Sequence, residues 1–242
     1  MKEKLKVAWI SAGVSSFIAA YLCKDLDRAI YIDIDDQHPD SMRFINDCAK
    51  YLPCDIEILK SRYNSVDEAC RAYNYIVTPS GARCTYVLKK EVRKIWEREA
   101  RTKYDLVYVW GMDSTEKDRA ERLIDTMDYC AHEFPLIDNN ITKAEAHGLL
   151  EKLGIKRPVM YDLGYNNNNC IGCVKGGMGY WNKIRVDFPE VFASRCKLER
   201  DIGHSIIKGL FLDELDPQRG RNEKIVIPEC GIMCEINGGG IL

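Results

Sequence analysis

Residues 5–16 read LKVAWISAGVSS, and this stretch decides the fold because a mostly apolar run passes directly into a short polar loop. Leu5 to Ile10 has the length and composition of a buried β-strand, and Ser15 to Leu26 carries apolar residues at helical spacing. Gly13 lets the backbone approach an anion, the serines offer hydroxyl donors, and the start of a helix presents unpaired N–H groups. The loop is therefore either a phosphate cradle or an ordinary tight turn that begins a helix.

The next hundred residues repeat the pattern of strand and helix. Strands are predicted at 29–34, 55–59 and 106–110, and helices at 41–51, 66–75 and 86–101, with Ser41 as the N-cap of the first. The last helix has the clearest apolar stripe, formed by Val87, Leu88, Val92, Ile95 and Trp96. This alternation predicts an α/β fold in which a parallel sheet lies between two layers of helices. The loops at 11–16, 33–36 and 111–113 would then meet at the carboxyl edge of the sheet, where such folds bind ligands.

The composition is that of a globular protein: of 242 residues, 46% are apolar and 30% are charged, and the formal net charge is -2. This charge gives no overall basic field for nucleic acid, although it leaves room for a local basic patch. No apolar run approaches the roughly 18 residues of a membrane span, and the first residues do not resemble a secretory signal. We therefore expect a cytoplasmic protein without membrane contact, whose 11 cysteines are mostly free thiols unless some of them hold a metal.

The character of the chain changes near residue 160. A polar turn, GYNNNN at 164–169, precedes Cys170-Ile171-Gly172-Cys173 and a Gly-rich stretch, and residues 190–209 have helical character. The tail contains PECGIMC at 228–234. We expect residues 1–160 to form a nucleotide-binding domain, and residues 161–242 to form a Cys-rich, partly irregular appendage that packs on the same site.

The loop SAGVSS resembles the SGGxDS pyrophosphate loop of the adenine nucleotide α-hydrolase-like superfamily, the PP-loop or HUP fold, with Ala12 and Ser15 in place of Gly and Asp. Later segments resemble, in the same order, those of the phosphoadenosine phosphosulfate (PAPS) reductase family. They are IYIDIDDQHPDSMRFI at 30–45, GARCTYVLKKEV at 81–92, VWGMDSTEKDRAERL at 109–123, FPLIDNNITKAEAHGLL at 134–150, YDLGYNNNNCIGCV at 161–174 and ECGI at 229–232. The resemblance extends over nearly the whole chain.

The resemblance implies an adenine-nucleotide site at the first loop and at the end of the second strand. The residues implied are Ser11, Gly13, Ser15, Ser16 and Asp33, and those implied near the anionic end of the nucleotide are Gly111, Lys117, Arg119 and Arg122. The three basic residues have an alternative interpretation as the solvated face of a helix. Met112 and Asp113 stand where the family has a basic residue.

In the family, the cysteine of the ECGI segment attacks the sulfur of the substrate, so Cys230 is the implied nucleophile. A nearby cation would have to favour its thiolate, and Arg221 and Lys224 precede it. Cys84, Cys170 and Cys173 match three of the four cysteines that hold a [4Fe–4S] cluster in adenylyl sulfate (APS) reductases, and the fourth ligand would be Cys230, Cys234 or an external group. Zinc, a metal-free redox pair and ordinary thiols are the alternatives.

Three functions are compatible with these features. The first is a PAPS- or APS-reductase-like enzyme that is regenerated by a thioredoxin-type reductant. The second is an enzyme that cleaves ATP to AMP and pyrophosphate while activating an acceptor, nucleic acid among the acceptor classes. The third is a nucleotide-binding protein without catalysis. The family resemblance also implies a homo-oligomer.

Overall fold

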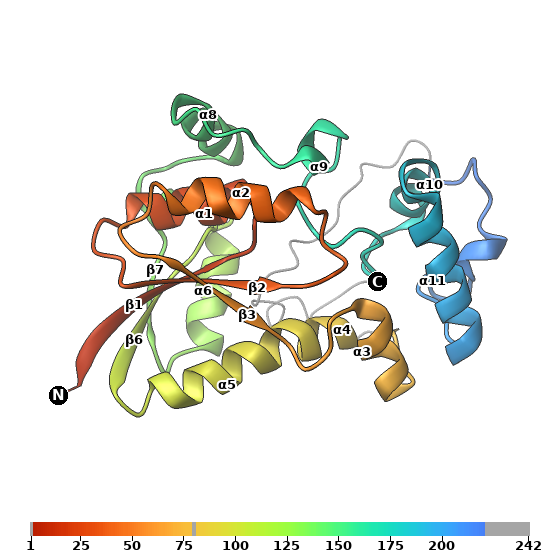
Figure 1. The fold of residues 1–242 in the computed structure, drawn as a ribbon, viewed down its shortest axis with the longest axis horizontal. Helices are drawn as coiled ribbons and strands as arrows, with labels where there is room; N and C mark the ends of the chain where they lie inside the picture. The colour runs from red at the N-terminus through yellow and green to blue at the C-terminus, as the bar shows by residue number, and fades with distance from the viewer. Residues whose placement is uncertain (1, 79–80, 221–242) are drawn as a thin grey trace.

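The computed structural model describes residues 2–78 and 81–220, and its centre is a parallel sheet with helices on both faces (Figure 1). The strand order is β3-β2-β1-β6-β7, and each neighbouring pair is parallel. These strands are β1 Glu3–Ile10, β2 Arg28–Asp33, β3 Ile56–Lys60, β6 Tyr104–Val109 and β7 Ala131–Glu133. The predicted α/β class with a parallel sheet is confirmed.

Alternation along β1 explains why helices cover both faces. Ala8 and Ile10 pack against α1 Val14–Leu22, α2 Asp40–Ala49, α7 Pro135–Asp138 and α8 Lys143–Lys152. Val7 and Trp9 face the other layer, where the helices are α3 Val66–Tyr73, α5 Glu91–Ala100 and α6 Lys117–Thr126. Because both faces are covered, the central strands are apolar on both sides.

The helix expected at 86–101 begins earlier and is less regular than the sequence indicates. It is made of α4 Arg83–Thr85, a π-helical segment Tyr86–Lys90 and α5, in succession. Val87, Leu88 and Val92 are buried as expected, but Ile95 is 59% exposed, so its place in the apolar stripe was wrong. A π-helical turn changes the phase of the helix, which rotates later residues away from the face that the 3.6-residue period predicts.

The ends of other expected elements also differ. Helix α1 ends at Leu22 rather than Leu26, and α3 ends at Tyr73, where Asn74 adopts a left-handed conformation. Ser41 is not an N-cap, because α2 begins at Asp40 with Pro39 before it. The helix expected at 190–209 ends at Ile202, where Gly203 has φ of 72°. A left-handed residue stops a helix, and only glycine adopts that conformation at little cost.

Residues 159–220 pack against the carboxyl edge of the sheet and against α3 (Figure 1). They contain α9 Val159–Asp162, α10 Met178–Asp187, α11 Pro189–Ile202 and a 3-10 turn Leu212–Glu214. Elsewhere in the chain, a two-stranded ribbon of β4 Val77–Thr78 and β5 Gly81–Ala82 precedes α4. Trp181 and Leu198 are fully buried in the same apolar cluster as Val7 of β1. Among the described residues, no helix is long and apolar enough to cross a membrane.

Candidate functional site: the crevice between the first and fourth parallel strands

The strand order reverses at β1, and we use the word crevice for the region at this switch point where β1 and β6 end. The chain proceeds from β1 to β2 and β3 on one side, and then returns to β6 on the other side. In open α/β sheets, ligands bind beyond the carboxyl ends of the strands at such a switch point. The loops at 11–13 and 110–116 are therefore the two walls of the candidate site.

These two walls are in direct backbone contact at Gly111. A Cβ atom placed on Gly111 would lie 2.5 Å from the Cα of Ser16 and 2.6 Å from its backbone nitrogen. No side chain fits there, so Gly111 lets the loop after β6 approach the first turn of α1. The sequence predicts both residues in one site, and the structure brings them together.

The serine hydroxyls close the first loop on itself. Ser16 Oγ donates to the carbonyl of Gly13 at 2.9 Å, accepts from the backbone N–H of Ser11 at 3.1 Å and lies 3.2 Å from Ser11 Oγ. Ser15 lies in the first turn of α1 and is buried. The backbone N–H groups of this first turn have no carbonyl acceptor one turn earlier in the helix, and such groups can donate to an anion.

Ala12 has an unusual backbone conformation, and its carbonyl is contacted by a residue 156 positions later in the chain. Its φ is 56°, in the left-handed region that favours glycine, and its side chain is fully buried. The side-chain amide of Asn168 donates to the carbonyl of Ala12 at 2.9 Å and to Ser41 Oγ at 3.0 Å. Ser41 thus helps to hold this clamp, a role different from the N-cap predicted for it.

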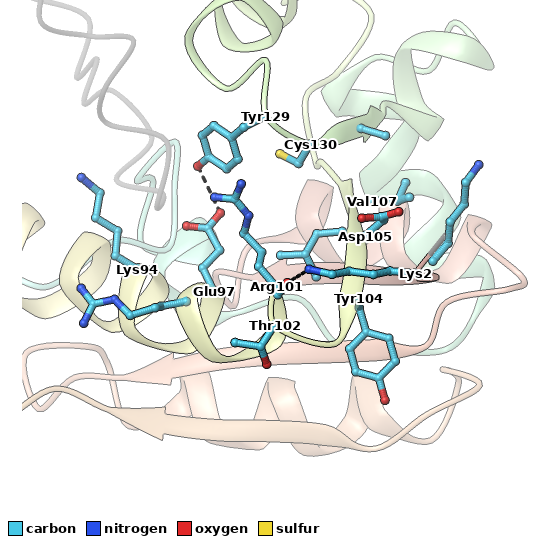
Figure 2. Close-up of a pocket in the computed structure, with 14 residues that line it drawn as sticks. Lys2, Lys94, Glu97, Arg101, Thr102, Tyr104, Asp105, Val107, Tyr129 and Cys130 are labelled. Carbon is cyan, nitrogen blue, oxygen red and sulfur yellow. Dashed lines mark hydrogen bonds between the residues drawn. The ribbon is translucent and has the colours of Figure 1, made fainter.

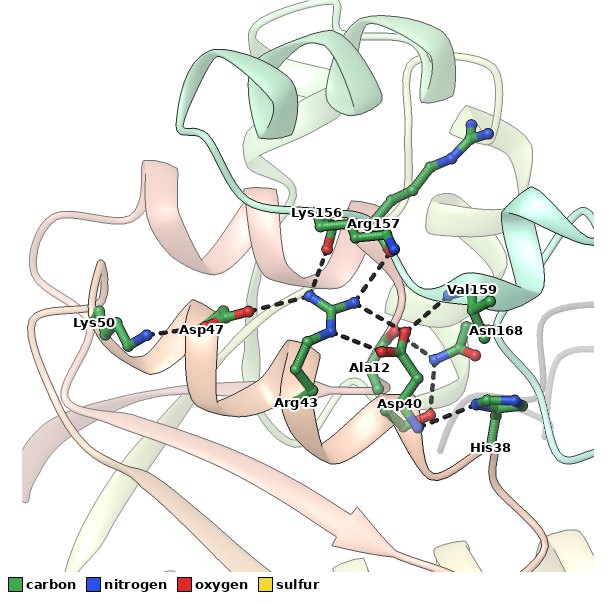
Figure 3. Close-up of polar contacts among 11 residues, drawn as sticks. Ala12, His38, Asp40, Arg43, Asp47, Lys50, Lys156, Arg157, Val159 and Asn168 are labelled. Carbon is green, nitrogen blue, oxygen red and sulfur yellow. Dashed lines mark hydrogen bonds and ion pairs between the residues drawn. The ribbon is translucent and has the colours of Figure 1, made fainter.

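The segment 156–168, which we call the strap, is hydrogen-bonded to α2 and to Ala12 of the first loop (Figure 3). Arg43 on α2 donates to the carbonyls of residues 156 and 157 at 2.8 and 3.2 Å. Asp40 accepts from the backbone N–H of Val159 at 2.9 Å and forms an ion pair with Arg43 at 2.7 Å. Tyr161 places its hydroxyl 3.4 Å from the backbone nitrogen of Val14, at the first turn of α1. The strap therefore reaches the amides that would bind an anion.

At the end of β2, two aspartates have different roles. Asp33, the predicted nucleotide contact, lies at the edge of the sheet and pairs with Lys60 of β3 at 3.2 Å. Asp36 forms a buried ion pair with Arg195 of α11, and accepts from the backbone N–H of Val66 at 2.6 Å. The carbonyl of Asp36 also accepts from the N–H of Ile171 at 2.7 Å. Asp36 thus attaches the C-terminal region to the sheet.

The loop after β6 is less basic at the crevice than the resemblance implies. Met112 is buried in the apolar core, so it does not replace the expected cation. Asp113 is buried and accepts from both the N–H and the hydroxyl of Thr115, at 2.8 and 2.6 Å. Arg119 forms an ion pair with Glu116. Lys117, the first residue of α6, is exposed.

The turn that carries Cys170 and Cys173 is rigidly supported. The hydroxyl of buried Tyr180 accepts from the N–H of Cys173 at 2.8 Å and lies 3.4 Å from the carbonyl of Cys170. Both cysteines and Cys84 are buried in one apolar cluster. Within the described ranges, however, no three His, Cys, Asp or Glu side chains are grouped to hold a metal ion. Cys230 and Cys234 lie outside the described residues, and the described residues by themselves do not provide a ligand set, so we assign no step to a metal or cluster.

Burial makes most of the other thiols poor nucleophiles. It raises the pKa of Cys23, Cys70 and Cys130 to about 12 and that of Cys196 to about 11. Burial also raises the pKa of Cys48 and Cys54. Because the thiolate is the reactive form, these six groups are structural at neutral pH.

The sequence matches no protein-family model and has no significant match among curated proteins. The candidate site is therefore defined by its geometry. Three contributors were not predicted from the sequence: Tyr161, Asn168 and Arg195. The run of four asparagines at 166–169 marked a turn, but its pattern does not show which amide points inward.

Proposed function

We propose that the chain binds an adenine nucleotide in the crevice between β1 and β6 and that it is a PAPS- or APS-reductase-like enzyme. The observation that carries the proposal is the contact of Gly111 with Ser16 at the switch point of the sheet. Around this contact, the first turn of α1 supplies amide donors for a phosphate or sulfate group. The adenine identity and the sulfur chemistry rest on the resemblance of the ordered sequence segments.

In the proposed reaction, the thiolate of Cys230 attacks the sulfur of the bound sulfonucleotide. The bond between that sulfur and the bridging phosphate oxygen breaks, the nucleotide leaves with the bonding electron pair, and an S-sulfonated cysteine forms. A dithiol reductant of the thioredoxin type then attacks Cys230 Sγ and releases sulfite. The resulting mixed disulfide is resolved by the second thiol of the carrier, which ends as a disulfide while Cys230 returns as a thiol.

The direct test measures sulfite from PAPS and from APS with thioredoxin as the reductant. We expect turnover by the full chain and none above background by Cys230→Ser, which should still bind nucleotide in calorimetry. Cys196→Ser is the matched control, because Cys196 is a partly buried thiol whose raised pKa makes it unreactive. Equal sulfite release by the wild type and Cys230→Ser would refute the thiol chemistry, and absence of nucleotide binding would refute the site.

One observation favours a second candidate, an enzyme that cleaves ATP to AMP and pyrophosphate. The carboxylates of Asp113 and Glu116 lie in the loop after β6. They would repel an anionic substrate that carries no metal ion, and a cation at this place would attract it. ATP arrives with Mg²⁺, which neutralises much of its charge and prefers oxygen ligands. Release of pyrophosphate from ATP in the presence of an acceptor, with no sulfite from PAPS or APS, would favour this candidate over the reductase.

A further inference from the structure

A cavity of about 750 Å³ lies at the amino edge of the sheet, at the opposite ends of β1 and β6 from the crevice (Figure 2). It exists because β7 is shorter than β6. Strand β7 pairs only with Val107–Val109, so no strand in the described ranges pairs with the outer edge of Tyr104–Leu106. The C-terminal half of α5 and the segment at 129–131 form the other walls. The cavity is therefore a feature of the fold, with strand backbone on one side.

The cavity is lined by more positive than negative side chains. Its cations are Lys2, Lys4, Lys94, Arg98 and Arg101, and its acids are Glu97 and Asp105. Lys4, Arg98 and Arg101 make no ion pair with any described residue, and Lys2 Nζ donates to the carbonyl of Arg101. An excess of about three positive charges is thus gathered at one place on a chain whose formal net charge is -2.

The acid nearest these cations is already engaged. Glu97 is buried and accepts from Tyr108 Oη at 2.8 Å and from Tyr129 Oη at 3.1 Å. The guanidinium of Arg101 lies 4.7 Å from the centre of the Tyr129 ring. These contacts fix the aromatic wall of the cavity, and they do not compensate the charges of Lys4 and Arg98.

Helix electrostatics explain only part of this arrangement. Arg98 and Arg101 lie at the C-terminal end of α5, where cations interact favourably with the helix dipole. That interaction does not explain Lys2, which precedes β1, or Lys4 of β1, which both line the same cavity.

We propose that this cavity is a second binding site, for a small ligand that carries several phosphate charges. Its volume is in the range of pockets that take metabolites. The cations line the cavity together with Tyr129, which is 41% exposed. Burial keeps Cys130 on the wall as a neutral thiol, since it raises the pKa of this group to about 12. The proposal is independent of the crevice and of the reaction proposed there.

The test titrates the full chain with inorganic tripolyphosphate, pyrophosphate and ATP in calorimetry at low and high salt. Lys4→Glu/Arg98→Glu is the test variant, and Lys152→Glu/Lys208→Glu, which reverses two exposed charges elsewhere, is the matched control. We expect tripolyphosphate affinity to fall roughly tenfold or more in the test variant and to stay within about twofold in the control. Equal affinities in all three proteins, or no binding, would overturn the proposal.

Further results distinguish a nucleotide from a free polyphosphate as the ligand, and the cavity from the crevice as the binding site. ATP binding more tightly than tripolyphosphate at the site sensitive to Lys4→Glu/Arg98→Glu would assign a nucleotide, and the reverse order would assign a free polyphosphate. A twelve-residue single-stranded oligonucleotide that binds more tightly than either, with the same sensitivity, would overturn the assignment to a small ligand. If Gly111→Ala loses ATP binding and Lys4→Glu/Arg98→Glu keeps it, that ATP binds in the crevice. Either proposed site can therefore be refuted without the other.

Discussion

The side-chain amide of Asn168 donates to the carbonyl of Ala12 at 2.9 Å, and Ala12 has a φ of 56°. A left-handed alanine costs about 1–2 kcal/mol, and it stands in the loop whose amides would bind the anion. Asn168, 5% exposed, is in position to stabilise this conformation. The pair therefore helps to hold the first loop in this conformation without ligand.

We expect Asn168→Ala to weaken adenine-nucleotide binding roughly tenfold, because the lost hydrogen bond is worth about 1 kcal/mol and the loop relaxes. Ala12→Gly should rescue much of this loss in the double variant, since glycine adopts the left-handed conformation readily. Calorimetry with ATP and APS measures the affinity of all four proteins. A double variant that binds as weakly as Asn168→Ala alone would show that Asn168 acts in another way.

The close approach at Gly111 predicts a large effect from one methyl group. Gly111→Ala should destabilise the protein by about 1–3 kcal/mol and reduce nucleotide affinity, because the loop after β6 must move away from Ser16. Gly148→Ala is the matched control: it lies in α8 with nothing within 4 Å of the new Cβ, and it should stabilise by up to about 1 kcal/mol. Urea unfolding measures both changes, and similar effects at the two positions would contradict the packing argument.

The buried pair of Asp36 and Arg195 connects the sheet to the C-terminal region. Arg195→Met should cost about 3–5 kcal/mol, because it leaves the Asp36 carboxylate buried without its partner. Lys197→Ala, which breaks an exposed ion pair with Asp201 on the same helix, should cost less than about 1 kcal/mol. Asp36→Leu/Arg195→Met should be more stable than Arg195→Met. If it is less stable, the hydrogen bond that Asp36 accepts from the N–H of Val66 outweighs the penalty of burying the unpaired carboxylate.

Acid should weaken the attachment of the strap to α2, because Asp40 loses its negative charge when it is protonated. The hydrogen bonds from Arg43 lower the pKa of Asp40 to about 2. A carboxyl group whose pKa is depressed in the folded protein stabilises the fold at pH values above its ordinary pKa near 4. This stabilisation is lost as the pH falls toward 2. Asp40→Asn should therefore cost about 1–2 kcal/mol at pH 7, after allowance for partial exposure, and this difference should shrink below pH 4.

The measurement for Asp40 is the free energy of unfolding of the wild type and Asp40→Asn at pH 7, 4 and 3. Asp125→Asn, at an exposed position on α6, provides the comparison and should show little change at any of these values. A cost for Asp40→Asn that stays constant from pH 7 to pH 3 would show that the carboxylate charge is not what fastens the strap.

Much of the fold could be predicted because its signals are local. The run from Leu5 to Ile10, the loop with Gly13 and the alternating strands place the parallel sheet and its carboxyl edge. The π-helical segment at Tyr86–Lys90 could not be predicted, because it changes the register of a helix without changing its composition.

Of the candidate site, the sequence predicts that Ser16 and Gly111 lie at the same edge of the sheet, since both follow strands that end there. It does not predict Asn168, Tyr161 or Arg195. Each of these acts through a partner more than a hundred residues away, and a polar side chain on a turn has no periodicity that reveals its direction. The buried Met112 was visible as a departure from the basic pattern, but only packing shows that its side chain turns into the core.

The clamp between Ala12 and Asn168 joins residues 156 positions apart, and this separation has a consequence for the newly made chain. During synthesis, β1 and the first loop emerge long before their clamp exists, and contacts of such sequence separation close late in folding. Until residues 166–169 have left the ribosome, the first loop of the nascent protein would lack the hydrogen bond from Asn168 to Ala12. If the loop binds the nucleotide as proposed, binding would be postponed until at least 168 of the 242 residues have been made, and nucleotide affinity would report on completed folding.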